Sequence, residues 1–239
     1  SLLSGLTLAM SVLPEEIPVA FSTFMALGAY RLYKKMVIAR TPYTVETLGA
    51  ATVICVDKTG TITENNMQLA TIYDYTSDKY IDYSSEKGTF NEVLNYAVWA
   101  SEIDPFDAME KSLHQYYGSL ANFDERPSYN MVHEYPLGGT PPIMTHVFQN
   151  KNAEHIIACK GAPEGVLRQC SIAEQEKIEI QNKVKALASK GYRVLGVAKA
   201  NISLEELPKS QQEIKFEFLG LVAFSDPPKK NMASIFQTF

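Results

Sequence analysis

Five consecutive residues, Asp57-Lys58-Thr59-Gly60-Thr61, combine a carboxylate, a cation, two hydroxyls and a glycine. They follow residues 51–54, an apolar run rich in β-branched side chains that predicts a buried strand. Open α/β sheets bind ligands beyond the carboxyl ends of their strands, where this aspartate would lie. A carboxylate there can attack a phosphoryl group and form an acyl phosphate. The lysine would neutralise the phosphoryl oxygens, the hydroxyls would donate hydrogen bonds, and the glycine would allow close approach.

The string D-K-T-G-T-I-T that begins at Asp57 resembles the phosphorylation motif of P-type ATPases, the ion pumps that pass through an aspartyl phosphate. The resemblance implies an α/β fold: an incomplete haloacid-dehalogenase-like (Rossmannoid) phosphorylation domain. Into it is inserted an α+β nucleotide-binding domain, an antiparallel sheet flanked by helices. ATP and Mg²⁺ are the implied cofactors, with Mg²⁺ held by Asp57 and Thr59. The implied catalytic residues are Asp57, Lys58, Thr59, Gly60 and Thr61.

The first thirty residues carry only two charges, Glu15 and Glu16, and are otherwise apolar or small. A bilayer is crossed by about 20 such residues. Pro14 and Pro18 each remove a helical N–H, which frees carbonyls beside the two carboxylates, a set of oxygens suited to a hard cation. This P-E-E-I-P segment resembles the broken fourth membrane helix of cation-pumping P-type ATPases, and the resemblance assigns the transported cation to Glu15. A soluble amphipathic helix kinked at proline is the alternative.

A basic cluster, Arg31, Lys34, Lys35 and Arg40, follows this span and predicts that residues after about 31 are cytoplasmic. The resemblance further implies that the parent protein crosses the lipid bilayer several times. The net charge of −5 gives no electrostatic basis for binding nucleic acid. Two acids and no cysteine in the P-E-E-I-P segment favour a hard divalent cation such as calcium over a soft metal.

Periodicity predicts several elements after the motif. Residues 73–90 are polar, aromatic and turn-rich, which indicates short strands and loops, and residues 91–101 have an amphipathic helical pattern. Asp104 and Pro105 predict the N-cap and first residue of a second helix. Ser171 and Glu174 form a capping-box pattern for a third, which would run through residue 189. Strands are predicted over residues 155–159, 192–198 and 216–224.

Segments of this insertion resemble the nucleotide-binding domain of the pumps. Residues 104–111 match D-P-x-D-x-M-E-K, which implies that Glu110 lies near the adenine. Lys160 and Gly161 begin K-G-A-P-E, whose lysine lines the nucleotide pocket, and Arg193 begins R-V-L, whose arginine contacts phosphates. Leu137 occupies the position of a phenylalanine that stacks on adenine, and its aliphatic side chain predicts weaker ATP binding.

The resemblance divides the chain into four parts. Residues 1–34 are the broken membrane helix and its cytoplasmic extension, and residues 35–65 are the first part of the phosphorylation domain. Residues 66–225 are the nucleotide-binding domain, and residues 226–239, which begin with the D-P-P-K hinge, start the second part of the phosphorylation domain. The T-G-D and G-D-G-x-N-D segments that follow this hinge in the family do not occur here. The chain is therefore expected to bind ATP without turnover and to depend on the remaining domains of the pump.

The sequence is also compatible with two alternatives. A soluble phosphatase of the haloacid dehalogenase class shares the aspartate nucleophile, but it usually has a second aspartate two residues later, where this chain has Thr59. A general acid missing from that position predicts slow hydrolysis of the acyl phosphate, as a pump requires. The other alternative is not an enzyme: a nucleotide-binding module without its catalytic half.

Overall fold

The computed structural model describes residues 3–5, 7–8, 16–41, 43–83 and 88–238, and they form two compact units, Ser1–Val56 and Asp57–Phe239. In the first unit, helix α2 spans Glu16–Lys34 and helix α3 spans Tyr43–Gly49. Pro18 lies in the first turn of α2, where a helix has no internal partner for its N–H groups. The helix therefore tolerates this proline without a kink.

Nowhere in the described ranges is a helix both long and apolar enough to cross a membrane. Helix α2 occupies the second half of the span predicted as a broken membrane helix, residues 1–34, and the membrane role of this span stays a prediction. Glu15, the predicted ligand of the transported cation, lies outside the described residues.

The buried strand predicted over residues 51–54 is wrong in this structure, because residues 51–57 are exposed and have no regular secondary structure. A strand is stable only when a neighbour satisfies its backbone hydrogen bonds. No described strand pairs with this run. The haloacid-dehalogenase-like part of the predicted fold therefore stays a prediction.

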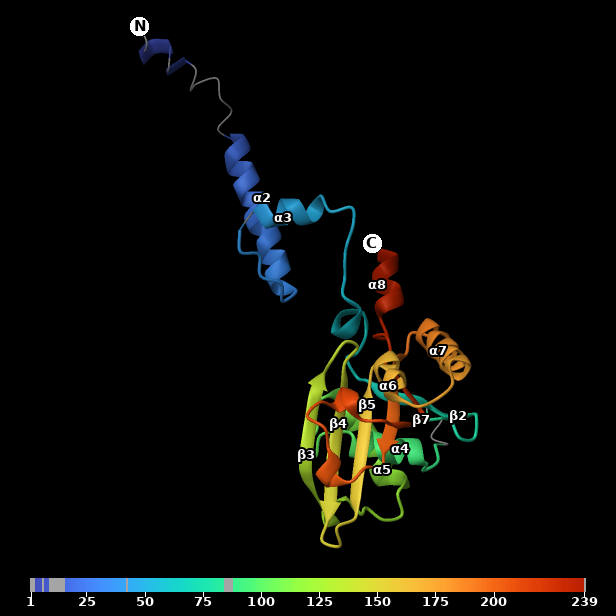
Figure 1. The fold of residues 1–239 in the computed structure, drawn as a ribbon. Helices are drawn as coiled ribbons and strands as arrows, with labels where there is room; N and C mark the ends of the chain where they lie inside the picture. The colour runs from blue at the N-terminus through green and yellow to red at the C-terminus, as the bar shows by residue number, and fades with distance from the viewer. Residues whose placement is uncertain (1–2, 6, 9–15, 42, 84–87, 239) are drawn as a thin grey trace. The chain divides into compact units, whose positions relative to one another are not determined.

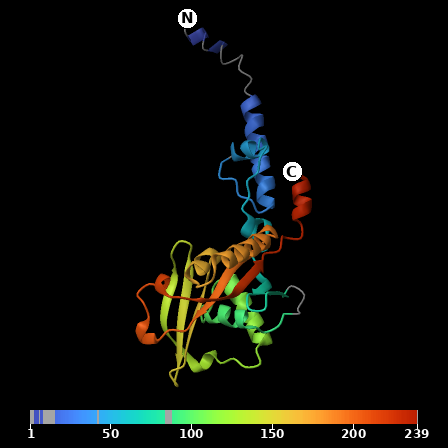
Figure 2. The same cartoon turned by 45° about the vertical axis from the view of Figure 1, so that its right-hand side comes forward.

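The second unit contains one antiparallel sheet of seven strands in the order β2-β1-β7-β6-β5-β4-β3 (Figures 1 and 2), which confirms the predicted antiparallel sheet flanked by helices. The strands are β1 (Gln68–Asp74), β2 (Lys79–Asp82), β3 (Tyr129–Gly138), β4 (Ile143–Asn150), β5 (His155–Gly161), β6 (Arg193–Ala200) and β7 (Glu217–Ser225). The helical segments are η1 (Lys58–Ile62), α4 (Glu92–Trp99), α5 (Ala108–Leu120), η2 (Arg126–Ser128), α6 (Pro163–Gln169), α7 (Glu174–Ser189), η3 (Leu204–Glu206), η4 (Gln211–Glu213) and α8 (Met232–Thr238).

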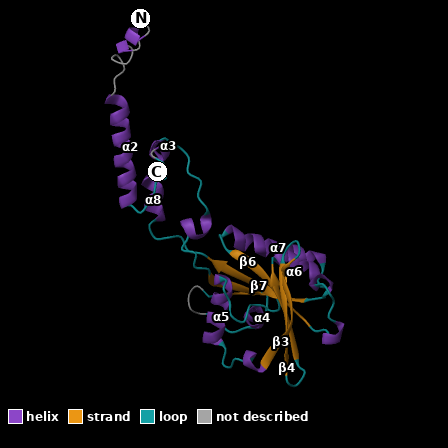
Figure 3. Cartoon of the chain, turned by 90° about the vertical axis from the view of Figure 1, so that its left-hand side faces the viewer, coloured by secondary structure: helices purple, strands orange, loops and turns teal. Residues whose placement is uncertain are grey.

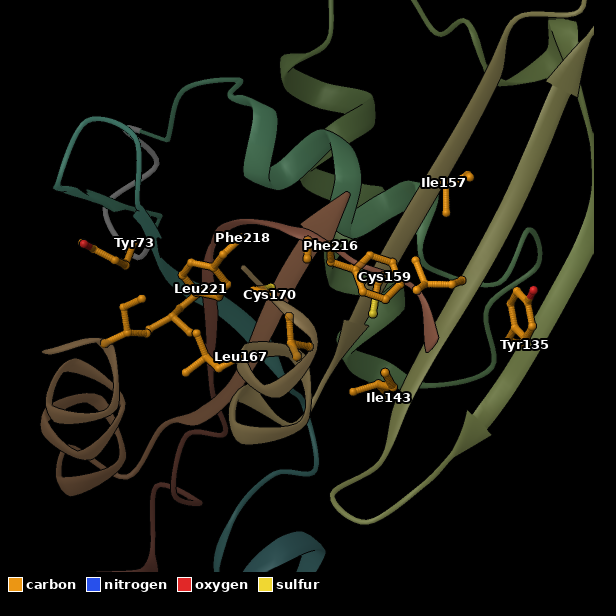
Figure 4. Packing of buried hydrophobic residues seen from close by; sticks show 14 of the residues in the cluster. Tyr73, Tyr135, Ile143, Ile157, Cys159, Leu167, Cys170, Phe216, Phe218 and Leu221 are labelled. Atoms are coloured by element: carbon orange, nitrogen blue, oxygen red, sulfur yellow. The ribbon is translucent and has the colours of Figure 1, made fainter. Parts of the chain in front are cut away.

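Helices cover both faces of this sheet: α4 and α5 lie on one face, and α6 and α7 lie on the other (Figure 3). Each helical layer has its own core. Leu94 of α4 and Leu113 of α5 pack with one set of sheet residues. On the opposite face, Leu167 of α6 packs with Phe218 and Leu221 of β7 (Figure 4). Because both faces are covered, the interior strand β7 is apolar and buried along nearly its whole length.

Gly220 of β7 lies where the backbone of β1 approaches closely. A β-carbon at this position would lie 2.1 Å from the carbonyl oxygen of Tyr73 and 3.0 Å from Cγ2 of Val93. We expect Gly220→Ala to lower the free energy of unfolding by about 2–3 kcal/mol, because the strand must shift within a packed core. Urea denaturation measures this loss.

Gly118 of α5 provides the matched control, because a β-carbon there would meet no atom of a described residue within 4 Å. Gly118→Ala should raise stability by up to about 1 kcal/mol, since alanine is the better helix former. Equal denaturation midpoints for Gly220→Ala and the unmodified chain would contradict the assigned packing.

The chain enters and leaves the sheet through two segments that lie side by side. Thr63 Oγ1 donates a hydrogen bond of 2.5 Å to Asp226 Oδ2, and the backbone N–H of Asn66 donates one of 3.1 Å to Oδ1 of the same carboxylate. Thr63 also forms a backbone bridge with Pro228. Asp226 thus links the incoming segment to the outgoing one.

Candidate functional site

A cavity of about 400 Å³ lies between α5 and the sheet, beside the junction of β5 and α6. Apolar side chains from several elements form much of its wall, among them Met109, Leu113, Leu137, Met144 and Leu195. Four charged residues also line it: Asp107, Glu110, Lys160 and Arg193. Small-molecule sites have this size and this combination of apolar walls with few polar groups.

The five residues expected to bind nucleotide all line this one cavity, although they come from four separate parts of the sequence. They are Glu110 of α5, Leu137 of β3, Lys160 and Gly161 of β5, and Arg193 of β6. The structure thus brings them together around a single space, while their roles in binding remain predictions.

Lys160 is held inside the protein by two partners. Its side chain is buried, and its Nζ donates hydrogen bonds of 2.5 Å to Glu110 Oε1 and 2.6 Å to Ser101 Oγ. Burial lowers the pKa of Lys160, and the Glu110 carboxylate acts in the opposite direction. An ordinary exposed lysine is therefore excluded at this position. Because Glu110 balances its charge, Lys160 serves the cavity as a fixed, oriented donor.

The start of α5 positions Glu110. Asp107 is the N-cap, and its Oδ1 accepts hydrogen bonds from the backbone N–H groups of Met109 at 2.8 Å and Glu110 at 3.3 Å. The predicted N-cap at Asp104 is wrong, because the helix begins at Ala108. Satisfying these free N–H groups fixes the first turn, and its third residue, Glu110, then reaches Lys160 on β5.

Gly161 lets β5 pass close to β4 at the cavity wall. A β-carbon here would lie 2.5 Å from the carbonyl oxygen of Pro142 and 2.6 Å from Cα of Ile143. Only glycine fits this approach without a shift of the backbone. The glycine of the K-G-A-P-E motif therefore has a steric reason for its place in the cavity wall.

Arg193 is the first residue of β6 and is exposed at the cavity. Of the described residues that line this space, it is the cation that forms no ion pair with a carboxylate. A guanidinium group offers a planar set of donors that matches the oxygens of a phosphate. The cavity thus has one cation available to an anionic ligand.

The predicted catalytic loop lies outside this cavity. Lys58–Ile62 forms a single π-helical turn, η1, with exposed Asp57 at its N-cap. Lys58 Nζ donates a 3.1 Å hydrogen bond to the carbonyl oxygen of Gly191, and Gly60 has φ +78°, a conformation that favours glycine. Thr61 is exposed, and the side chain of Thr59 is not among the described ones. The catalytic and Mg²⁺-binding roles of this loop remain predictions.

Residues 107–231 match the family model described as P-type ATPase, cytoplasmic domain N, and this match covers just over half of the chain. The chain belongs to the P-type ATPases. The resemblance inferred from the D-K-T-G-T-I-T motif is thereby confirmed, and so is the preference for this family over the soluble haloacid dehalogenase phosphatases. In this P-type ATPase chain the family match contains every residue that lines the cavity.

Several curated proteins resemble this P-type ATPase chain along 95% of its length. A calcium-transporting ATPase of Bacillus subtilis (strain 168) is 26% identical over 268 residues, and the calcium-transporting ATPase 1 of Saccharomyces cerevisiae is 28% identical over 271 residues. Plasma membrane ATPase 1 of Saccharomyces cerevisiae is 30% identical over 239 residues. The chain spans only 30%, 28% and 24% of the length of these relatives.

Sequence reasoning missed some lining residues of this P-type ATPase chain. Helical spacing could have predicted Asp107 and Leu113, because each lies three positions from Glu110 and so on the same side of the start of α5. Met144 could not be predicted from the sequence, because it lines the cavity only as the cross-strand neighbour of Lys160. Ser101 follows α4 and carries no motif, so only the fold reveals its contact with Lys160.

Proposed function

We propose that the cavity binds ATP, with the adenine against its apolar wall and the phosphates toward Arg193. The observation that carries the proposal is an apolar cavity lined by the guanidinium group of Arg193, which forms no ion pair with any described carboxylate. The buried Lys160–Glu110 pair supplies oriented polar groups inside the same space. Leu137 is largely exposed, so its side chain is free to cover a bound base without stacking on it.

In the intact parent pump, we propose that this ATP passes its γ-phosphate to Asp57. The carboxylate displaces ADP by attack at the γ-phosphorus, which forms the aspartyl phosphate. Lys58 then balances charge on the transferred group, and Gly60 and Thr61 give it close contact and hydrogen bonds. Oxygen donors suit Mg²⁺, which takes six of them. The Asp57 carboxylate and the Thr59 carbonyl would supply two, and Mg²⁺ would neutralise phosphate charge there.

The phosphorylated pump is proposed to move a divalent cation such as calcium across a lipid bilayer. Support comes from the two relatives named calcium-transporting ATPases, and from the acidic, cysteine-free P-E-E-I-P segment in which Glu15 is the proposed ligand. Residues after about 31 would then lie in the cytoplasm. Transport and turnover would need the remaining domains of the parent pump, and this chain by itself would only bind nucleotide.

Arg193→Ala tests the orientation of the nucleotide. We expect the affinity for ATP to fall by about tenfold or more, which is the value of a hydrogen bond to a charged group. The affinity for adenosine should stay the same, because adenosine has no phosphate group to contact Arg193. Isothermal titration calorimetry of the chain with each ligand measures both values.

Lys185→Ala is the matched control, because Lys185 is an exposed cation on α7 and does not line the cavity. It should bind ATP and adenosine as the unmodified chain does. Unchanged ATP affinity in Arg193→Ala, or an equal loss for ATP and adenosine, would rule out phosphate binding at Arg193.

A further inference from the structure

Three side chains with metal-binding atoms lie close together in the second unit, and none of them lines the cavity described above. They are Glu102, Glu134 and His146, and one ligand atom from each lies within 4.8 Å of the others. Glu134 of β3 and His146 of β4 are directly opposite in the strand register, so they share a face of the sheet. Glu102 reaches them from the segment that follows α4.

The imidazole of His146 is already oriented for a ligand. The residue is fully buried, and its Nδ1 lies 3.2 Å from the carbonyl oxygen of Ser101. A carbonyl oxygen only accepts hydrogen bonds, so this contact places the proton on Nδ1 and leaves a lone pair on Nε2. Backbone carbonyls orient metal-binding histidines in the same way.

Nε2 of His146 is buried, and it has no hydrogen-bond partner among the residues that the structure describes. It lies 4.0 Å from Oε1 of Glu102, and Glu134 is the other neighbour in the cluster. Burial lowers the pKa of His146, while the two carboxylates act in the opposite direction. Three acceptors, the lone pair on Nε2 and the two carboxylates, therefore lie around one point, and none of the described residues donates a hydrogen bond to this Nε2. A cation at this point would satisfy all three.

We propose that His146 Nε2 and one carboxylate oxygen each of Glu102 and Glu134 bind a divalent transition-metal ion of the zinc class. One imidazole and two carboxylates are a ligand set that zinc accepts, with a fourth position left for water. Imidazole favours zinc and its neighbours over magnesium and calcium. The ligands of this site are different residues from Asp57, proposed for Mg²⁺, and from Glu15, proposed for the transported cation.

The observed spacing is slightly wider than a loaded site requires. Metal–ligand bonds of about 2.0–2.2 Å at tetrahedral angles place ligand atoms about 3.4 Å apart. The ligand atoms of the cluster are within 4.8 Å of one another. Glu102 and Glu134 are both exposed, so their carboxylates are free to rotate inward while buried His146 stays fixed.

Metal titration of the full chain without histidine tags tests this site. A Cys55→Ser background removes the exposed thiol, which is a competing zinc ligand. We expect one equivalent of Zn²⁺ to bind by calorimetry, and one equivalent of Co²⁺ to give the visible absorption of a four- or five-coordinate ion. Excess Mg²⁺ should displace neither ion.

Glu102→Gln and Glu134→Gln should each weaken binding at least about tenfold, because each removes an anionic ligand with almost no change in shape. Both residues are exposed, so these variants should fold, whereas a substitution of buried His146 would also disturb the packing around it. Glu179→Gln, an exposed acid on α7, should bind as the background does. Failure to bind one equivalent, or equal affinity in all three glutamine variants, would overturn the proposal.

Discussion

Lys160→Met should lower the free energy of unfolding by about 3–5 kcal/mol, because it leaves the charge of Glu110 without its partner inside the protein. Glu110 is 8% exposed, and Lys160 Nζ is its ion-pair partner at 2.5 Å. The substitution keeps the length of the side chain and removes only its charged end. Equilibrium urea denaturation, followed by circular dichroism, measures the loss.

Two further variants make this measurement specific. Lys199→Met removes a lysine whose pairs with Glu92 and Glu217 are largely exposed, and such pairs are worth about 0–1 kcal/mol. The double variant Lys160→Met/Glu110→Leu should recover most of the lost stability, because it leaves no unpaired charge. A loss in Lys160→Met no larger than in Lys199→Met would show that the buried pair does not hold α5 against β5.

Asp57→Asn in the intact parent pump should abolish the phosphorylated intermediate, because an amide cannot act as the carboxylate nucleophile. After incubation with radiolabelled ATP and Mg²⁺, the unmodified pump should carry acid-stable, hydroxylamine-sensitive label, and the variant should carry none. In this chain, the affinity for ATP should be unchanged by Asp57→Asn, because Asp57 does not line the cavity.

Asp104→Asn is the control for this experiment, because Asp104 is an exposed acid outside the cavity lining. It should retain the label. Label that persists in Asp57→Asn would place the phosphate on another residue and would refute the proposed role of the D-K-T-G-T-I-T motif.

Local patterns predicted elements whose partners are close in sequence or whose faces are plainly apolar. The amphipathic pattern over residues 91–101 corresponds to α4, and the apolar run over residues 216–224 corresponds to β7. The run over residues 51–54 has the same β-branched character, but it has no strand beside it among the described residues. The β-propensity of a residue measures how well its side chain suits a sheet, but it does not show whether a neighbouring strand is present.

The start of α7 shows a second limit. Ser171 and Glu174 match a capping box, yet the helix begins at Glu174, and Glu176 Oε2 accepts the hydrogen bond from the backbone N–H of Ala173. A bridge between Cys170 and Phe216 keeps the preceding chain extended. That long-range contact outweighs the local motif, and no pattern in the sequence announces it.

The family motifs predicted the cavity residues, because each of those residues lies within a motif that can be read along the sequence. The cluster of Glu102, Glu134 and His146 could not be predicted in this way, because it depends on the register of two paired strands. β3 pairs with β4 through irregularities between Met131 and His133 and between Tyr135 and Gly138. Each shift moves the following side chains relative to their partners. Counting along the sequence therefore could not place Glu134 opposite His146.

The seven-stranded sheet begins and ends at neighbouring positions, so the segment from Gln68 to Ser225 is joined to the rest of the chain at two points that lie side by side. Gln68, which begins β1, is the direct register partner of Ser225, which ends β7. Opposed residues of antiparallel strands lie about 5 Å apart between Cα atoms. If the segment from Gln68 to Ser225 were inserted into a loop of another domain, the two ends of the interrupted loop would have to separate by only about this distance. The same closeness makes circular permutation practical: a short linker from Ser225 to Gln68 would need to span almost no distance.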